Sequence, residues 1–403
     1  MDSPRGRIHT LKAIAEGELS LDASVAVHFD SCLGCFACVS ACPAGVRYDE
    51  LIEQVRPQLN QAELRNPWQR QLRKLLLGLL PYPGRLRALL QPFRFYSGQS
   101  LQRLARASGL TRLFGPELEA MEQLLPSLSS DSFGPDPSGV FPAEGSYRAR
   151  VGLVLGCVQR VFDPSVNVAT LAVLQANGVE VVLPEAQGCC GAATHHQGEL
   201  EQTRDLARDL VKQFEVAAAG QPLDAVLVAA SGCGHTLKQY PQLLNGESGF
   251  SAPVLDVHEF LLSLGLSEHF RSRLKPMDLK VAYHDACHMI HGQGIRSQPR
   301  QLLMAIPGLT LREATEAGVC CGSAGIYNVV QPSEAAALGQ IKAADLAATG
   351  ADVVASANIG CSLQIRRHLA EQGQLQAVLH PMELLAQSAG LLNAAAPAAA
   401  NNA

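Results

Sequence analysis

Residues 188–196 read GCCGAATHH, and residues 319–327 read VCCGSAGIY. Each stretch carries a vicinal pair of cysteines followed by glycine, and each is flanked by an isolated cysteine on both sides. The intervals between corresponding cysteines are nearly constant: 130 residues from Cys157 to Cys287, 131 from Cys189 to Cys320 and 128 from Cys233 to Cys361. A regular interval of this kind indicates that the second half of the chain is an internal duplication.

The sequences between these cysteines support the duplication. AVLVAASGCG at 225–234 aligns with VVASANIGCS at 353–362, and VLDVHEFLL at 254–262 aligns with AVLHPMELL at 377–385. We therefore expect two structural units of the same fold, which are called unit 1 and unit 2 below.

Short apolar or β-branched runs in each unit predict buried parallel strands. These runs are 151–155, 179–183 and 225–229 in unit 1, and 280–283, 309–312 and 352–355 in unit 2. Helical patterns lie between them, such as 166–175, which ends at Asn177-Gly178, and 199–218, which ends at Gly220. Alternating strands and helices predict an α/β fold with right-handed crossovers.

All eight cysteines of the duplicated half follow the carboxyl end of a predicted strand, where α/β sheets place their ligands. We expect three loops in each unit to bring four thiols into one crevice, and in a reducing compartment such thiols indicate a metal. Divergent vicinal side chains suit two irons of a cluster better than one tetrahedral ion. The alternatives are structural zinc, a redox-active vicinal disulfide, or cysteines that serve as small buried hydrophobes. The candidate ligands are Cys157, Cys189, Cys190 and Cys233 in unit 1, and Cys287, Cys320, Cys321 and Cys361 in unit 2.

The remaining four cysteines lie near the N-terminus in SCLGCFACVSACPAG, residues 31–45. Their spacing, Cys32-x2-Cys35-x2-Cys38-x3-Cys42-Pro43, is the bacterial ferredoxin pattern for a 4Fe-4S cluster. We expect three of the thiols to share a tight curl of backbone. The fourth, Cys42, should leave that curl, because in two-cluster ferredoxins it ligates the partner cluster.

Composition excludes several classes of protein. The chain has 403 residues, of which 47% are hydrophobic and 17% charged, so it is not a disordered chain. A formal net charge of −5 gives no reason to expect a nucleic-acid partner. No apolar run reaches the roughly 18 residues of a membrane span, and the N-terminus has no apolar signal core. We expect a cytoplasmic protein with reduced thiols.

No glycine-rich nucleotide motif or Walker loop is present, so we expect no flavin or nucleotide on this chain. Residues 65–116 carry ten basic residues and no acidic one. This stretch predicts contact with a quinone site, an acidic partner or the inner face of a membrane, or else an interdomain helical segment with snorkelling arginines.

Several histidines accompany the cysteines: His195, His196, His284, His288 and His291. Some could tune or ligate a metal, but we expect most of them to lie beside the site or at the surface. A duplicated histidine ligand is not supported, because Ser323 and Ala324 follow the second Cys-Cys-Gly. We expect Asp285 to be a solvated carboxylate.

The chain resembles the iron-sulfur subunit of glycolate oxidase, more properly a glycolate dehydrogenase, from Ser3 to about Leu392. The resemblance rests on SPRGRI at 3–8, CPAGVRY at 42–48, ASGCG at 230–234, CCGSAG at 320–325 and ANIGC at 357–361. It implies one ferredoxin-type module and two cysteine-rich CCG domains. It also implies an electron-transfer subunit, not itself catalytic on the 2-hydroxy acid, that serves FAD-containing glycolate oxidase subunits.

Two features depart from related patterns. That family normally carries a first ferredoxin run upstream of SPRGR, so either the chain starts late, at an internal methionine, or its four local cysteines hold one cluster. We favour the late start. Heterodisulfide reductase places a further cysteine three residues after the last one of each unit, where this chain has Thr236 and Gln364. This difference argues against the non-cubane cluster type of that reductase.

The expected organisation is a 4Fe-4S ferredoxin-like module at 1–64, a basic helical connector at 65–127 and a linker at 128–147. CCG domain 1 follows at 148–268, CCG domain 2 at 276–392 and a disordered tail at 393–403. Alternative functions are the equivalent subunit of a lactate or glycerol-3-phosphate dehydrogenase, a thiol-disulfide reductase and a zinc-stabilised scaffold.

Overall fold

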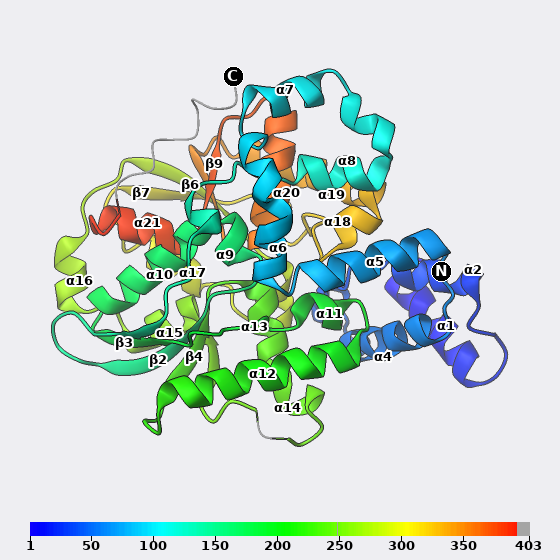
Figure 1. The fold of residues 1–403 in the computed structure, drawn as a ribbon, viewed down its shortest axis with the longest axis horizontal. Helices are drawn as coiled ribbons and strands as arrows, with labels where there is room; N and C mark the ends of the chain where they lie inside the picture. Colours follow the sequence, from blue (N-terminus) through cyan, green and yellow to red (C-terminus); the bar gives the residue numbers. More distant parts are fainter. Residues whose placement is uncertain (248, 393–403) are drawn as a thin grey trace.

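The computed structural model describes residues 1–247 and 249–392, so the predicted tail at 393–403 lies outside the described residues. Figure 1 shows the N-terminal helices on one side of the molecule and the two sheets on the other, with the connector helices running between them. Among the described residues, no helix has both the length and the apolar character needed to cross a bilayer.

The N-terminal region is helical, as expected. Its helices are α1 (Pro4–Ala15), α2 (Ala23–Asp30), α3 (Ala37–Ser40) and α4 (Tyr48–Gln61). Side-chain oxygens of Ser3 and Asp22 accept hydrogen bonds from the first turns of α1 and α2, which fixes where these helices begin. Phe29, Ile52 and Leu59 are fully buried between α2 and α4 and form the core of this region.

The connector consists of short helices, because prolines and glycines interrupt it. The elements are α5 (Pro67–Leu79), α6 (Pro83–Leu90), η1 (Gln91–Phe95), α7 (Ser100–Ala107), η2 (Leu110–Phe114), α8 (Pro116–Gln123) and η3 (Asp131–Phe133). Pro67, Pro83 and Pro116 each occupy the first position of a helix, where the missing N–H costs nothing.

Unit 1 is built on a five-stranded sheet in the order β1-β3-β2-β4-β5. Its strands are β1 (Gly139–Phe141), β2 (Ala149–Val154), β3 (Val179–Leu183), β4 (Ala225–Val228) and β5 (Val254–Asp256). All pairings are parallel except that of the edge strand β1, which is antiparallel to β3. The sequence had suggested only a linker around β1.

Unit 2 repeats this arrangement without the extra edge strand. Its sheet has the order β7-β6-β8-β9, from β6 (Leu279–His284), β7 (Leu309–Arg312), β8 (Val353–Ser356) and β9 (Ala377–Leu379), all parallel. The register is repeated too: Val151 pairs with Val181 and Ala225, and its counterpart Val281 pairs with Leu311 and Val353. The predicted duplication and α/β fold class are confirmed.

Helices cover both sheets. Those of unit 1 are α9 (Gln159–Phe162), α10 (Pro164–Ala176), α11 (Ala192–His196), α12 (Leu200–Ala218), α13 (Ser231–Lys238), α14 (Tyr240–Leu243), α15 (Val257–Leu264) and α16 (Glu268–Arg273). Those of unit 2 are η4 (His288–Gly292), α17 (Gln298–Leu303), α18 (Tyr327–Val330), α19 (Pro332–Ala348), α20 (Ile359–Glu371) and α21 (Pro381–Ser388). The predicted helices 166–175 and 199–218 correspond to α10 and α12.

The two units share one hydrophobic core. Helix α10 of unit 1 packs against α21 of unit 2, and α15 of unit 1 packs against α17 of unit 2. Residues of both sheets, such as Val151 and Val281, therefore belong to the same buried cluster. Because helices of the two units pack against each other in this way, the two sheets are held in a fixed relative position.

Two glycines inside helices allow a test of this packing. A Cβ at Gly339 in α19 would collide with the ring of His368 on α20, which is fully buried and bonded to Gln364 and Glu371. We expect Gly339→Ala to lower the free energy of unfolding by about 1–3 kcal/mol through overpacking. Chemical denaturation followed by circular dichroism measures this change.

Gly78 in α5 provides the matched control, because a Cβ there meets no atom within 4 Å. Gly78→Ala should stabilise the protein by about 0.5 kcal/mol, since alanine loses less backbone entropy in a helix. Equal effects of the two substitutions would contradict the close packing of α19 on α20.

Candidate metal centre

The carboxyl ends of the two sheets meet around one cavity of about 150 Å³. Residues that line it join the two units: the Gly232 N–H donates to Asn358 Oδ1 at 3.2 Å, and the Ser231 N–H donates to the Ala357 carbonyl at 3.1 Å. The cavity is lined by all eight cysteines of the duplicated half: Cys157, Cys189, Cys190, Cys233, Cys287, Cys320, Cys321 and Cys361. The sequence predicted a crevice in each unit, whereas the structure has one cavity shared by both.

In unit 1 the thiols lie in direct contact. Cys189 Sγ is 3.1 Å from Cys157 Sγ, and the Gly191 N–H donates to Cys189 Sγ at 3.3 Å. Gly191 has φ +77°, and a Cβ there would press on Thr203, so glycine is required for this turn. Tyr240 fixes the loop further, because its hydroxyl donates to the Cys190 carbonyl at 2.9 Å.

Unit 2 repeats the glycine contact and adds another. The Gly322 N–H donates to Cys320 Sγ at 3.4 Å, as Gly191 does in unit 1. The Asn358 amide also donates to Cys361 Sγ at 3.3 Å. Donors of this kind stabilise thiolate sulfur and tune a bound metal.

Burial shifts the acidity of these thiols. The hydrogen bond with Cys189, followed by burial, raises the pKa of Cys157 well above its usual value. Contact with Cys320, followed by burial, does the same to the pKa of Cys287. All twelve cysteines are free thiols, and such a buried set ionises when a cation balances the charge. The donors present therefore fit iron-sulfur clusters.

The ferredoxin-type run adopts the expected curl. Burial, with the nearby Cys35 and Cys32, raises the pKa of Cys38, so these three thiols are neighbours. Cys42 is partly exposed, and backbone N–H groups of Val46 and Ala44 lower its pKa. The Gly34 N–H donates to Cys32 Sγ at 3.4 Å.

Aromatic side chains join this run to the cavity. The ring of Phe36 is buried and lies 5.0 Å from the ring of His288 and 5.1 Å from that of His235. His288 Nε2 donates to the Gly34 carbonyl at 2.9 Å and lies 3.1 Å from His196 Nε2. Phe36 has φ +60°, a conformation that a bulky residue adopts only when its surroundings enforce it.

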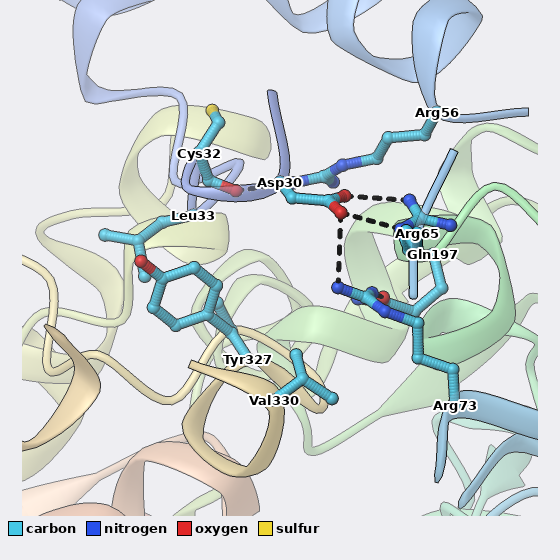
Figure 2. Close-up of a pocket in the computed structure, with 10 residues that line it drawn as sticks. Asp30, Cys32, Leu33, Arg56, Arg65, Arg73, Gln197, Tyr327 and Val330 are labelled. Carbon is cyan, nitrogen blue, oxygen red and sulfur yellow. Dashed lines mark hydrogen bonds and ion pairs between the residues drawn. The ribbon is translucent and has the colours of Figure 1, made fainter. Parts of the chain in front are cut away.

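Three arginines hold the run in place beside this junction. Figure 2 shows Arg65 and Arg73 pointing at the Asp30 carboxylate and Arg56 reaching the Cys32 carbonyl. The Arg56 guanidinium donates to that carbonyl at 2.8 Å, and Arg65 donates to both Asp30 oxygens at 2.7 and 2.8 Å. The space between them is only about 10 Å³, room for one water molecule, so this cluster is structural.

One sequence expectation needs correction. Asp285 is not a solvated carboxylate: it is 8% exposed and pairs with Arg300 at 2.7 Å, because Arg300 on α17 lies directly opposite. Most of the histidines near the cysteines lie beside the site: His195, His284 and His288 are buried, and His196 is half-buried.

Sequence reasoning missed one feature of the site and left a second, the position of His284, undecided among several histidines. The bridging role of Phe36 had no signal, since nothing in the sequence brings residue 36 next to residue 288. A ring nitrogen of His284 lies within 4.8 Å of Cys321 and Cys361 Sγ. The weak signal for this contact was its position three residues before Cys287, where unit 1 has Val154.

Comparison with known proteins agrees with the geometry. Residues 151–238 and 281–366 each match the cysteine-rich CCG domain family, and residues 68–125 match the linker region of the glycolate oxidase iron-sulfur subunit. The "Probable glycolate oxidase iron-sulfur subunit" of Bacillus subtilis is 33% identical over 399 residues, 96% of this chain and 88% of the relative. The chain belongs to the glycolate oxidase iron-sulfur subunit family.

Other relatives support this assignment. The glycolate oxidase iron-sulfur subunit of Escherichia coli is 30% identical over 392 residues, again 96% of this chain and 88% of the relative. Lactate utilization protein A of Oceanobacillus iheyensis is 25% identical over 247 residues, which is 59% of this chain and 96% of the relative. This relative thus shares only part of the chain.

The donor assignment can be tested through metal content. Cys189 supplies a buried sulfur atom that contacts Cys157 Sγ and the Gly191 N–H. We therefore expect the variant Cys189→Ser to lose most of the iron held in the cavity. Anaerobic purification with iron and sulfide analysis measures the loss. Ser323→Ala, which lines the same cavity but removes no thiol, should retain its iron. Unchanged iron in Cys189→Ser would contradict the assignment.

Proposed function

We propose that this chain is the electron-transfer subunit of a glycolate oxidase, passing electrons from a partner flavoprotein toward a quinone or another acceptor. One observation above all supports this function. Eight thiols from both units line one cavity, and the ferredoxin-type run contacts that cavity through Gly34 and His288. An arrangement with two adjacent sets of sulfur donors suits electron relay better than bond-making chemistry.

The proposed ligands follow from this arrangement. Iron-sulfur clusters, when bound, accept and release single electrons with little rearrangement. We assign a 4Fe-4S site to Cys32, Cys35, Cys38 and Cys42, with an upstream run as the alternative source of the fourth thiolate. We assign the cavity cysteines of both units to further iron-sulfur clusters: Cys157, Cys189, Cys190, Cys233, Cys287, Cys320, Cys321 and Cys361.

The chemistry divides between subunits. Oxidation of glycolate to glyoxylate releases two electrons and two protons, which a flavin can accept as a unit. No nucleotide motif occurs in this chain, so we place the flavin on an FAD-containing partner. Substrate choice then belongs to that partner, and a lactate-oxidising partner would require no change at the cavity.

The residues between the run and the cavity define the electron path. Cys35 lies near Cys287, whose charge raises the pKa of Cys35 beyond the effect of burial alone, to about 11. Phe36 and His288 stack with an interplanar angle of 9° beside this contact. These groups exclude water and keep the two sites at a fixed short separation, which favours fast transfer.

Loss of one sulfur ligand in the cavity should slow electron delivery to the quinone without slowing flavin reduction. We expect Cys320→Ser to reduce quinone reduction by the purified complex at least tenfold, because a sulfur donor of unit 2 is lost. Flavin reduction by glycolate should continue at the wild-type rate. Stopped-flow absorbance of the flavin and steady-state quinone assays measure the two steps. Quinone reduction at the wild-type rate would refute the proposed role.

A second part of the proposal concerns the surface of the connector. Several large apolar side chains of this segment are exposed: Phe95, Leu101, Leu104, Leu113 and Phe114. Residues 65–116 have no acidic residue to repel anionic lipid. Ion pairs within the chain engage at least six of the ten basic residues of this stretch, so the apolar side chains would make the main contact: the six are Arg65, Arg70, Arg73, Arg87, Arg106 and Arg112. We infer that this surface rests on the anionic inner face of the cytoplasmic membrane.

Vesicle flotation tests the membrane contact. The double variant Leu104→Gln and Leu113→Gln should bind vesicles containing anionic lipid several-fold more weakly than the wild type, because it buries less apolar area. Val216→Gln, on α12 of unit 1, removes an equally exposed apolar side chain outside the connector and should bind normally. Failure of the wild-type complex to float with these vesicles would refute the membrane contact.

A further inference from the structure

His284 occupies an unusual position at the end of β6. Its side chain is buried, with 2% of the residue exposed, and neither ring nitrogen has a hydrogen-bond partner. Among the histidines of residues 1–247 and 249–392, only His284 has two ring nitrogens that are both buried and unpartnered. A buried polar atom without a partner costs about 1–3 kcal/mol, so its presence requires an explanation.

The surroundings of the ring suggest what that explanation is. A ring nitrogen of His284 and the sulfur atoms of Cys321 and Cys361 lie within 4.8 Å of one another. Cys321 and Cys361 line the shared cavity, and Asn358 donates to Cys361 from the other side. Imidazole nitrogen and thiolate sulfur are both common ligands of iron and zinc. The three donors are thus grouped as a metal would require.

The duplication provides a second, independent observation. His284 pairs with Ser356 on β8, and the corresponding pair in unit 1 is Val154 with Val228 on β4. Ser356 Oγ is also buried without a partner. Two apolar positions that face each other in unit 1 are therefore both polar in unit 2, and the polar atoms of both have no partner within the protein.

We propose that His284 is a nitrogen ligand to the metal centre of unit 2, alongside Cys321 and Cys361. Unit 1, with Val154 at this position, offers sulfur donors alone. The two halves of the cavity are therefore chemically unequal although their folds are the same.

This inequality rests on the proposed function. Both units carry the same four cysteines, so His284 adds to unit 2 a neutral donor that unit 1 lacks. An anionic thiolate in the place of the imidazole would add negative charge and lower the reduction potential of the centre.

Pulsed electron paramagnetic resonance tests the ligand directly. The reduced holo-complex, prepared with unlabelled or 15N-labelled histidine, should display a strongly coupled imidazole nitrogen whose signal changes with the isotope. His284→Val installs the unit 1 residue and should abolish that coupling. His284→Cys keeps a donor and should retain iron, lack the nitrogen coupling and have a lower midpoint potential in a redox titration.

His288→Phe is the matched control, because His288 also borders Cys287 but donates to the Gly34 carbonyl. The nitrogen coupling should persist in this variant. Nitrogen coupling that survives in both His284 variants, or a wild-type spectrum without coupled nitrogen, would overturn the proposal. Metal analysis that finds zinc in place of iron, in an amount that the His284 variants do not change, would also overturn it. Quinone reduction by the wild-type complex is measured separately, so loss of the electron-transfer role and loss of the ligand are distinguishable outcomes.

Discussion

Everything at the candidate centre depends on the carboxyl ends of two parallel sheets facing each other across one cavity. Parallel strands place their following loops at one edge, and each unit therefore delivers four cysteines to that edge. The packing of α10 against α21 and of α15 against α17 holds the two units together. Because the hydrophobic core is continuous through both units, the separation of the two thiol groups is set by core packing and not by mobile loops.

Burial of the thiols makes the cavity favour a bound cation. Thiols that are completely enclosed resist ionisation, and a cation that balances the sulfur charge stabilises the thiolate form. Backbone N–H groups of Gly191 and Gly322 are already directed at Cys189 and Cys320, at equivalent places in the two units. The duplicated backbone thus supplies the same electrostatic support twice, and differences between the units must come from side chains such as His284.

The N-terminal region is fastened to the cavity by two kinds of contact. Arg65, between α4 and α5, and Arg73 of α5 pair with Asp30, and Arg56 of α4 donates to the backbone of the cysteine run. These contacts hold the run against the body of the protein. Phe36 inserts among histidines contributed by both units. Ion pairs of this sort fix position, while the aromatic contact excludes water between the sites. Together they turn separate modules into one continuous relay.

The sequence by itself determined the duplication, the α/β class, most of the central strands and the twelve cysteines, because these are encoded in local periodicity and spacing. Strand runs such as 179–183 are readable since four of the five residues are apolar, and all four are buried in a largely parallel sheet. The sequence did not predict the antiparallel edge strand β1, because its three residues form a strand only by pairing with β3. Only the tertiary structure decided that the two cysteine sets share one cavity, that Phe36 meets His288, and that His284 faces Cys321 and Cys361. These contacts join residues far apart in the chain, and their distances follow from how helices pack between units, which no local pattern records.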